Sequence, residues 1–271
     1  MEVLTKLFYL KRRDYITPHY IRMTLESDSV SEYKEVTLGV NNKIFIAPDG
    51  VNKVYLPEYD EISKETKPLS ELLKPIKRTY TFKGVDVERK EMYVDFVAHG
   101  DEGPASSWAM NAPIGAELGV AMKLEKGKAL VPDVETCFLI GDATAIPVLG
   151  AILEELKEDV RVYVIIEIQS VEDIQQLKTK AKLELKWLIN PIPGVNSELS
   201  LEGIQFLDKY SDEKSFAYVA AEFESVKSLR NHLRNVKGWD KEQFYAYSYW
   251  KYGKTESVSE GERREERNRV V

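Results

Sequence analysis

The sequence of 271 residues is poor in the side chains that form disulfides and metal sites. It has one cysteine, Cys137, and three histidines, His19, His99 and His232, which are far apart in the chain. A single cysteine leaves no partner for an internal disulfide, and this small set of ligands argues against a transition-metal site built by the protein. Cys137 lies in the apolar run 137–140, which favours a buried structural thiol over a reactive nucleophile.

Long apolar runs and an excess of positive charge are also absent. No stretch approaches the roughly 20 apolar residues that cross a bilayer, and residues 1–10 alternate like a strand without the pattern of a secretory signal. With the lone cysteine, these absences predict a cytoplasmic protein that does not insert into membranes. The net charge of −7, with acidic and basic residues interspersed, argues against nucleic acid as the main partner.

The first 126 residues have the pattern of a small antiparallel β-barrel. Residues 54–75, which include Pro57, Pro68 and Pro75, are predicted to form an extended loop. A turn is expected at residues 13–18, and one short helix at 105–112. Short strands, whose number suggests a closed barrel, are predicted at 3–12, 20–25, 43–48, 78–85, 91–98 and 117–122.

Residues 127–254 alternate between strands and helices, which predicts a doubly wound parallel sheet. The predicted strands are 136–140, 160–168, 183–188, 216–221 and 243–249, and the helices are 145–157, 171–177, 197–209 and 224–236. Ligands bind at the carboxyl ends of such strands, where Gly141, Glu222 and Tyr249 fall. For the charged tail 255–271, both a solvated helix and a disordered segment remain open.

Two segments carry side chains suited to a large ligand. Arg78, Tyr80 and Thr81 place a guanidinium, an aromatic ring and a hydroxyl near one strand end, where they can bind phosphate and a flat ring. Residues 99–108 describe a turn followed by a helix start, a backbone site for an anion. Together they favour a flavin dinucleotide over a plain nucleotide. A simple loop at 99–104, and a core role for Tyr80, remain the alternatives.

Four motifs occur in an order and spacing that resemble the siderophore-interacting proteins. They are Arg78-Thr79-Tyr80-Thr81, the segment 99–106 followed by Trp108-Ala109, the segment 141–147, and Tyr249-Trp250-Lys251-Tyr252-Gly253. This family comprises flavin-dependent ferric-siderophore reductases of the ferredoxin-reductase superfamily, and the resemblance extends from about residue 3 to residue 253. It implies an α+β protein with an N-terminal Greek-key FAD-binding barrel, residues 1–126, and a C-terminal NAD(P)H-binding α/β domain, residues 127–254.

The resemblance also implies an activity and its site residues. Electrons pass from NAD(P)H through FAD to the Fe(III) of a siderophore, which releases Fe(II), and no catalytic side chain is required. The implied FAD-binding residues are Arg78, Thr79, Tyr80, Thr81, Ala98, His99, Asp101, Gly103, Pro104, Ala105, Ser106 and Trp250. The implied NAD(P)H-binding residues are Gly141, Asp142, Ala143, Thr144, Ala145, Glu167 and Glu222. Lys43, Lys251 and Lys254 are the expected substrate-binding residues at the mouth of the flavin cleft, and no metal ligand is expected.

Several alternatives remain open at this point. Asp142 or Thr144 suits a plain strand-to-helix cap, and Glu167 suits either a turn or a ribose, where it would favour NADH over NADPH. Departures from the family pattern, among them Lys83 and Ala143, weaken the assignment of nucleotide and substrate. One alternative is a flavin reductase of the same fold whose electron acceptor or donor differs, for example ferredoxin or a soluble iron chelate. A non-catalytic siderophore-binding protein is a further alternative. We expect a monomer.

Overall fold

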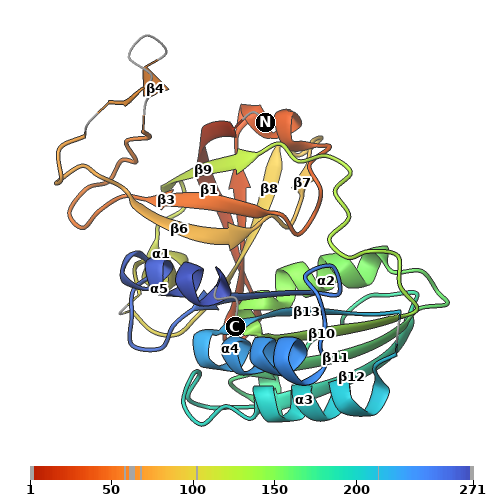
Figure 1. The fold of residues 1–271 in the computed structure, drawn as a ribbon. Coiled ribbons are helices and arrows are strands. Elements are labelled where there is room, and N and C mark those ends of the chain that lie inside the picture. Colours follow the sequence, from red (N-terminus) through yellow and green to blue (C-terminus); the bar gives the residue numbers. More distant parts are fainter. Residues whose placement is uncertain are drawn as a thin grey trace. The chain divides into compact units, whose positions relative to one another are not determined.

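The computed structural model describes residues 3–57, 59–60, 65–67, 69–101, 103–212 and 214–268. The chain divides into two compact units, Met1–Lys128 and Ala129–Val271 (Figure 1). Pro68, part of the predicted extended loop, lies outside the described residues. Within the described ranges, no helix has the length and apolar character needed to cross a membrane.

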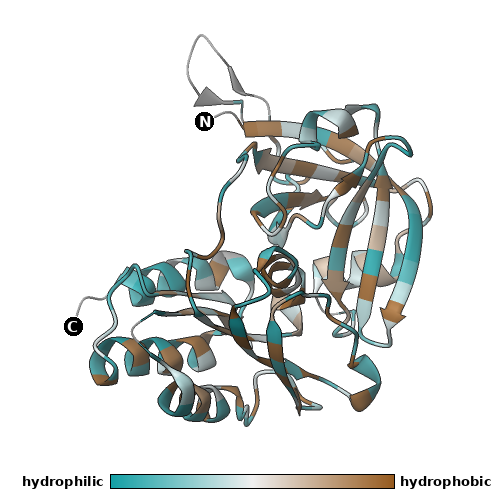
Figure 2. Ribbon diagram, turned by 90° about the vertical axis from the view of Figure 1, so that its right-hand side faces the viewer, coloured by the Kyte–Doolittle hydropathy of each residue, from teal (hydrophilic) through white to brown (hydrophobic). Residues whose placement is uncertain are grey.

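The first unit contains a seven-stranded antiparallel sheet in the order β6-β3-β9-β1-β2-β8-β7. Apolar residues recur at every second position of two central strands, so that Ile21, Met23 and Leu25 of β2 are fully buried together with Met92, Val94 and Phe96 of β8. Figure 2 shows hydrophobic and hydrophilic residues following one another along the strands. The strands are β1 (Val3–Thr17), β2 (Tyr20–Glu26), β3 (Asn41–Ile46), β6 (Ile76–Thr81), β7 (Val85–Asp86), β8 (Glu91–Val97) and β9 (Glu117–Lys123), with η1 (Asp28–Tyr33) and α1 (Pro104–Asn111) between them.

Three predictions for this unit need correction. Residues 13–17 were expected in a turn, yet they continue β1, which pairs with β2 through two irregularities that bend the strand. The predicted loop at 54–75 also contains a small pair of strands, β4 (Tyr59–Asp60) and β5 (Glu65–Thr66). The described strands form a half-barrel whose order ends at β6 and β7, whereas a closed barrel was expected.

The second unit contains a parallel sheet in the order β12-β11-β10-β13-β14. Every residue of β10 and β13 is buried, as expected for central strands covered on both faces. Helix α2 lies on one face, whereas α3 and α4 pack on the other (Figure 1). The elements are β10 (Thr136–Asp142), η2 (Ala143–Ala145), α2 (Ile146–Glu155), β11 (Arg161–Ile168), η3 (Val171–Asp173), β12 (Lys182–Ile189), α3 (Leu199–Tyr210), β13 (Ser215–Glu222), α4 (Phe223–Asn231), η4 (His232–Val236) and β14 (Phe244–Trp250). The predicted fold class, an antiparallel barrel-type sheet followed by a parallel α/β sheet, is confirmed.

The helix predicted at 171–177 is wrong in its length, because only the short turn η3 forms there. The charged tail, left open between a helix and disorder, is helical as α5 (Glu256–Asn268). Ser259, Arg263 and Glu266 are buried on one face of α5, and the Arg263 guanidinium donates to the backbone carbonyls of Ser248, at 3.0 Å, and Tyr249. The tail therefore packs on β14 through polar contacts, which is why it shows no apolar stripe.

Candidate functional site

The end of β6 carries the first predicted cofactor motif. Thr81 is buried, Arg78 and Tyr80 are half-buried, and Thr79 is exposed. Strand β3 pairs beside it, with Lys43 opposite Thr79, and the Lys43 ammonium donates to the Thr79 hydroxyl. The structure thus places a residue predicted to bind substrate directly beside the motif predicted to bind the flavin.

Aromatic packing joins this motif to the second predicted segment. The ring centroids of Tyr80 and Phe96 are 4.4 Å apart, and those of Phe96 and Trp108 are 5.9 Å apart. These three rings come from β6, β8 and α1, so residues 78–81 and 99–108 lie together although they are about twenty residues apart in the sequence. Phe96, which links them, was not predicted as a site residue, because it reads only as a core position of an alternating strand.

The start of α1 has the features of an anion site. Gly103 is the extended N-cap, no side chain caps the helix, and its first turn contains no acidic residue. Pro104 has no N–H, so the N–H groups of Ala105 and Ser106 are the first-turn donors without an intrahelical acceptor. A Cβ atom on Gly103 would lie 2.5 Å from Cε1 of His99, so any larger residue here would have to displace the His99 ring.

Polar contacts hold the loop before α1 in place. The His99 N–H donates to the buried Ser106 hydroxyl at 3.0 Å, and the Asn111 amide donates to the Asp101 carboxylate at 2.8 Å. Ala98 is buried at the end of the preceding strand, whereas His99 and Asp101 are exposed. Ser106 and Asp101, both predicted to bind the cofactor, therefore also shape the loop.

These groups fit a ligand that has a planar ring and a diphosphate. Arg78 supplies a cationic fork, α1 supplies backbone donors, and Tyr80 presents a half-buried ring. Asn42 lies opposite Tyr80 on β3 and is buried, and neither polar atom of its amide has a hydrogen-bond partner in the described structure. Such a group is costly unless a ligand or water satisfies it, so Asn42 is a further residue that the sequence motifs did not indicate.

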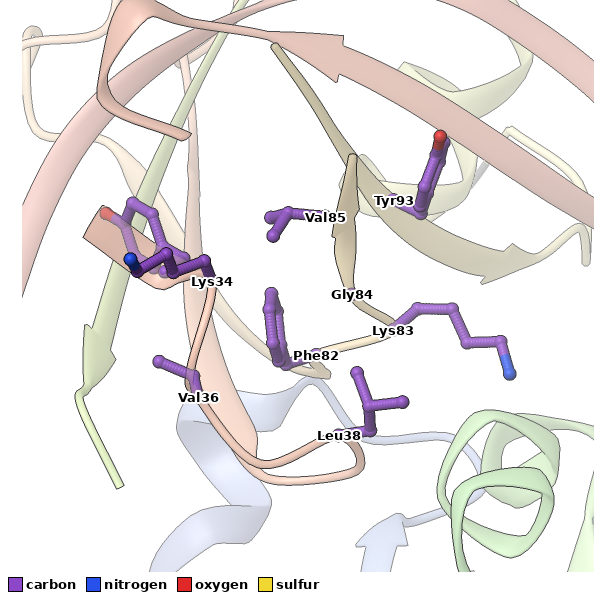
Figure 3. A pocket seen from close by; sticks show the side chains of 9 residues that line it. Lys34, Val36, Leu38, Phe82, Lys83, Gly84, Val85 and Tyr93 are labelled. Atoms are coloured by element: carbon purple, nitrogen blue, oxygen red, sulfur yellow. The ribbon is translucent and has the colours of Figure 1, made fainter. Parts of the chain in front are cut away.

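A separate pocket of about 230 Å³ lies beside the residues that follow the first motif. Figure 3 shows the Phe82 ring facing Val36 and Leu38, while the Lys83 side chain extends away from them. The residues that line this pocket are Tyr33, Lys34, Val36, Leu38, Phe82, Lys83, Gly84, Val85 and Tyr93. This set contains none of the predicted cofactor residues.

In the second unit, Asp142 acts as a cap at the end of β10. Its carboxylate accepts hydrogen bonds from the Thr144 N–H at 2.9 Å, the Glu222 N–H at 2.9 Å and the Trp250 indole at 2.8 Å. Burial raises the pKa of this carboxyl group, while these hydrogen bonds oppose the shift. The structure therefore shows the capping role that the sequence left open, with α2 beginning only at Ile146, after the turn η2 that contains Ala143 and Ala145.

Close packing within the second unit explains why residue 141 is a glycine. A Cβ atom there would lie 2.7 Å from the Ala145 Cβ and 2.8 Å from the Ala220 carbonyl oxygen. Both contacts are internal, between β10 and its neighbours. They account for the glycine without a nucleotide.

Glu167 and Glu222 are also bound internally. The Glu167 carboxylate accepts from the Ser197 hydroxyl at 2.6 Å and the Asn190 amide at 3.2 Å, and burial raises its pKa. Glu222 caps α4 by accepting from the Glu224 N–H at 2.6 Å, and it accepts from the Tyr252 N–H at 3.2 Å. Asp142 and Glu167 are paired residues of adjacent parallel strands, so the carboxyl edge of this sheet concentrates acidic groups.

The predicted residues after β14 form a turn. Lys251 and Lys254 are bridge partners across it, and both ammonium groups contact Glu262 of α5. Glu262 was not predicted, because its role depends on how the tail folds back. Within the described ranges, no group of three or more His, Cys, Asp or Glu side chains is arranged to hold a metal ion.

Comparisons with known proteins cover nearly the whole chain. Residues 9–122 match the model of the siderophore-interacting FAD-binding domain, and residues 134–253 match the model of the siderophore-interacting protein. The ferric vibriobactin reductase ViuB of Vibrio cholerae is 28% identical over 263 residues, which cover 96% of this chain and 94% of that protein. The siderophore-interacting protein SipS from Aeromonas hydrophila has a TM-score of 0.80 at 25% identity and covers 98% of both chains.

A more distant structure shows the fold alone. Phthalate dioxygenase reductase is 12% identical, with a TM-score of 0.57 over 94% of this chain and 70% of that one. Two family models in tandem, over 9–122 and 134–253, leave little of the chain unassigned. The chain belongs to the siderophore-interacting protein family, and its first unit is the FAD-binding domain of that family.

Proposed function

We propose that this protein is a ferric-siderophore reductase that uses FAD to move electrons from NAD(P)H to the Fe(III) of a siderophore, with release of Fe(II). The observation that carries the proposal is the arrangement of Arg78, Tyr80 and the uncapped start of α1 within a domain that matches the FAD-binding family model. The alignment with a ferric vibriobactin reductase over 96% of the chain supports the same activity.

The residues of the first unit hold the cofactor in this proposal. The Arg78 guanidinium binds a phosphate, the N–H groups of Ala105 and Ser106 bind the diphosphate, and the Tyr80 ring packs along the flavin. FAD, when bound, supplies the conversion between a two-electron donor and a one-electron acceptor. The protein itself therefore needs no side-chain acid or base, and its contribution is position and electrostatic environment.

The substrate contacts in this proposal are lysines. Ferric complexes of catecholates are anionic, and Lys43, Lys251 and Lys254 supply positive charge that attracts them. Fe(III) is a hard, highly charged ion that oxygen ligands hold tightly. Reduction lowers its charge, so Fe(II) is held less tightly and leaves the chelate.

The second unit supplies the donor site. We assign NAD(P)H to the carboxyl edge of its parallel sheet, at Gly141–Ala145 with Glu167 and Glu222, the usual ligand position in such sheets. The carboxylates of Asp142 and Glu167 lie at this edge and would repel an added 2′-phosphate, so we expect NADH to be preferred over NADPH. Because NAD(P)H is a cytoplasmic reductant, the same function places the protein in the cytoplasm, and we expect it to act as a monomer.

The test begins with the visible absorption spectrum of the purified protein. We expect a flavin spectrum that bleaches when NADH is added without oxygen, and that returns when a ferric siderophore is added with a chromogenic Fe(II) chelator. Reduction of ferredoxin or dyes without any preference for ferric siderophores would contradict the proposed acceptor. A colourless protein that takes up no FAD would contradict the redox function and support a siderophore-binding role.

If reduced ferredoxin bleaches the flavin and neither NADH nor NADPH does, NAD(P)H is not the electron donor. The proposal that a ferric siderophore is the acceptor would be unaffected. Size-exclusion chromatography and cell fractionation test the expected monomer and its compartment.

A further inference from the structure

The turn after β14 presents two lysines as a pair. Lys254 donates its backbone N–H to the Lys251 carbonyl at 3.1 Å, and the two residues are antiparallel bridge partners. Gly253 has φ +70°, a left-handed value that closes the turn. Because bridge partners direct their side chains to the same side, the turn itself sets the spacing of the two ammonium groups.

One carboxylate occupies this pair. The Lys251 ammonium donates to Oε2 of Glu262 at 2.7 Å, and the Lys254 ammonium donates to Oε1 of the same residue at 2.5 Å. These bonds and the two positive charges lower the pKa of Glu262 to about 2. The Lys251 ammonium also lies 4.1 Å from the ring centroid of Phe223, a cation–π contact. The geometry is that of a two-point anion site with one cation for each oxygen.

The anchoring of α5 does not depend on this contact. Arg263 bonds the backbone of β14, Glu266 is paired with the buried Arg230 of α4, and Ser259 is fully buried. The Glu262 side chain, in contrast, is 42% exposed. It can turn away from the lysines while the helix stays in place, since the groups that hold the helix lie on its buried face.

We propose that Glu262 is an internal anion that occupies the Lys251–Lys254 pair and that an anionic ferric chelate must displace to bind. This inference rests on the proposed function, in which these lysines contact the substrate. The pair then recognises two neighbouring anionic oxygens, as a carboxylate or a catecholate presents them. Glu262 reduces the net charge of the lysine pair from +2 to +1. Strongly anionic chelates can therefore compete with Glu262 for the lysines, whereas neutral chelates gain no affinity from them.

The test compares Glu262→Gln with Glu260→Gln in the FAD-loaded protein. The second variant removes the same charge from an exposed position of α5 and serves as the matched control. The substrates are a ferric tris-catecholate, which carries three negative charges, and a neutral ferric tris-hydroxamate. We expect Glu262→Gln to lower the KM for the tris-catecholate about three- to tenfold and to leave kcat unchanged. The effect on KM should weaken with added salt. The KM for the neutral chelate should not change.

Binding without turnover gives an independent measurement. Gallium(III) tris-catecholate has the same charge and cannot be reduced, so calorimetry reports its affinity even for a protein without reductase activity. We expect tighter binding to Glu262→Gln by a similar factor, and weaker binding to the double variant Lys251→Ala with Lys254→Ala. The Glu260→Gln control should change either constant less than twofold.

The outcomes separate the inference from the function beneath it. If the double lysine variant binds the gallium complex as well as the natural sequence does, the substrate role of the lysines is wrong, and the inference is wrong with it. If the lysine variant binds more weakly while Glu262→Gln binds no more tightly, the lysines keep their role and Glu262 is only a structural partner. Equal gains with the neutral and anionic chelates would also overturn the inference.

Discussion

The Arg13 guanidinium donates a hydrogen bond of 2.5 Å to the backbone carbonyl of Ala112, at the C-terminal end of α1. A second bond from the same side chain reaches the Ala109 carbonyl. A cation at this end of a helix satisfies carbonyls that lack intrahelical donors and opposes the helix dipole. The residue that holds the C-terminal end of α1 therefore comes from β1, about a hundred positions earlier in the chain.

Substitution of Arg13 with alanine should loosen α1. Loss of charge-assisted, partly buried hydrogen bonds costs about 1–3 kcal/mol, so hydrogen exchange of the α1 amides should accelerate by about fivefold or more. Arg12→Ala is the matched control, because Arg12 is exposed and pairs with its near neighbour Asp14. Equal exchange in α1 for the two variants would show that Arg13 does not hold the helix.

Arg78→Ala should reduce FAD retention. A guanidinium bound to phosphate is worth roughly 1.5–3 kcal/mol, so the Kd for FAD should rise by about 10- to 100-fold, measured by flavin fluorescence during titration of the apoprotein. Lys77→Ala removes a positive charge from the preceding, exposed position of β6 and controls for net charge alone. An unchanged flavin occupancy in Arg78→Ala would remove the phosphate role assigned to it.

Gly103→Ala should weaken FAD binding through a steric effect. The added methyl group would clash with the His99 ring, so this ring must move and the loop before α1 must adjust. His99 is exposed, so its displacement is compatible with folding, while the altered loop binds the diphosphate less well. FAD titration with circular dichroism as a folding control measures both effects.

The double variant His99→Ala with Gly103→Ala removes the clash and should recover FAD affinity. If the double variant is no better than Gly103→Ala, either the methyl group itself blocks the ligand or His99 contacts it. A Gly103→Ala protein that binds FAD normally would show that the diphosphate site does not need glycine at this position.

The contact between Glu262 and its lysines should persist over the physiological pH range. The pKa of Glu262 is lowered from 4.5 to about 2, so its stabilising effect is fully present above pH 4.5 and is lost as the pH falls from 4.5 towards 2. A side-chain carboxyl titration by NMR should therefore give a midpoint near 2. Lys254→Ala removes one of the two partners and should raise that midpoint; a midpoint of 4.5 in the natural sequence would show that the contact does not form in solution.

Local sequence patterns were enough for the order of elements. Alternation of apolar residues placed β2 and β8, whose side chains at 21, 23, 25, 92, 94 and 96 are all fully buried. The apolar runs of β10 and β13 predicted central strands of a parallel sheet. These predictions succeed because the period of a strand or helix is a property of neighbouring residues. They fail at 13–17, which extends β1 by pairing with the start of β2, and at 171–177, where only the short turn η3 forms.

The candidate sites divide in the same way. The motif at 78–81 and the segment 99–106 were visible in the sequence, since each carries its chemistry within a few adjacent residues. That Phe96 joins them, and that Asn42 lies buried opposite Tyr80, were not visible, because these contacts cross between strands. Asp142 was assigned both to a nucleotide and to a cap, and only the three-dimensional arrangement brought it to the Glu222 N–H and the Trp250 indole.

By itself, the sequence determined the two-part fold, the grouping of Arg78, Tyr80 and Thr81 within four residues, and the presence of two lysines after the last strand. The tertiary structure alone decided what those lysines contact. Glu262 is one acidic residue among many in a charged tail, and nothing in its immediate neighbours distinguishes it. It reaches Lys251 and Lys254 because buried Arg263 and Glu266 hold α5 against its unit, and such a long-range contact depends on the packing of the whole unit and not on local residue preference.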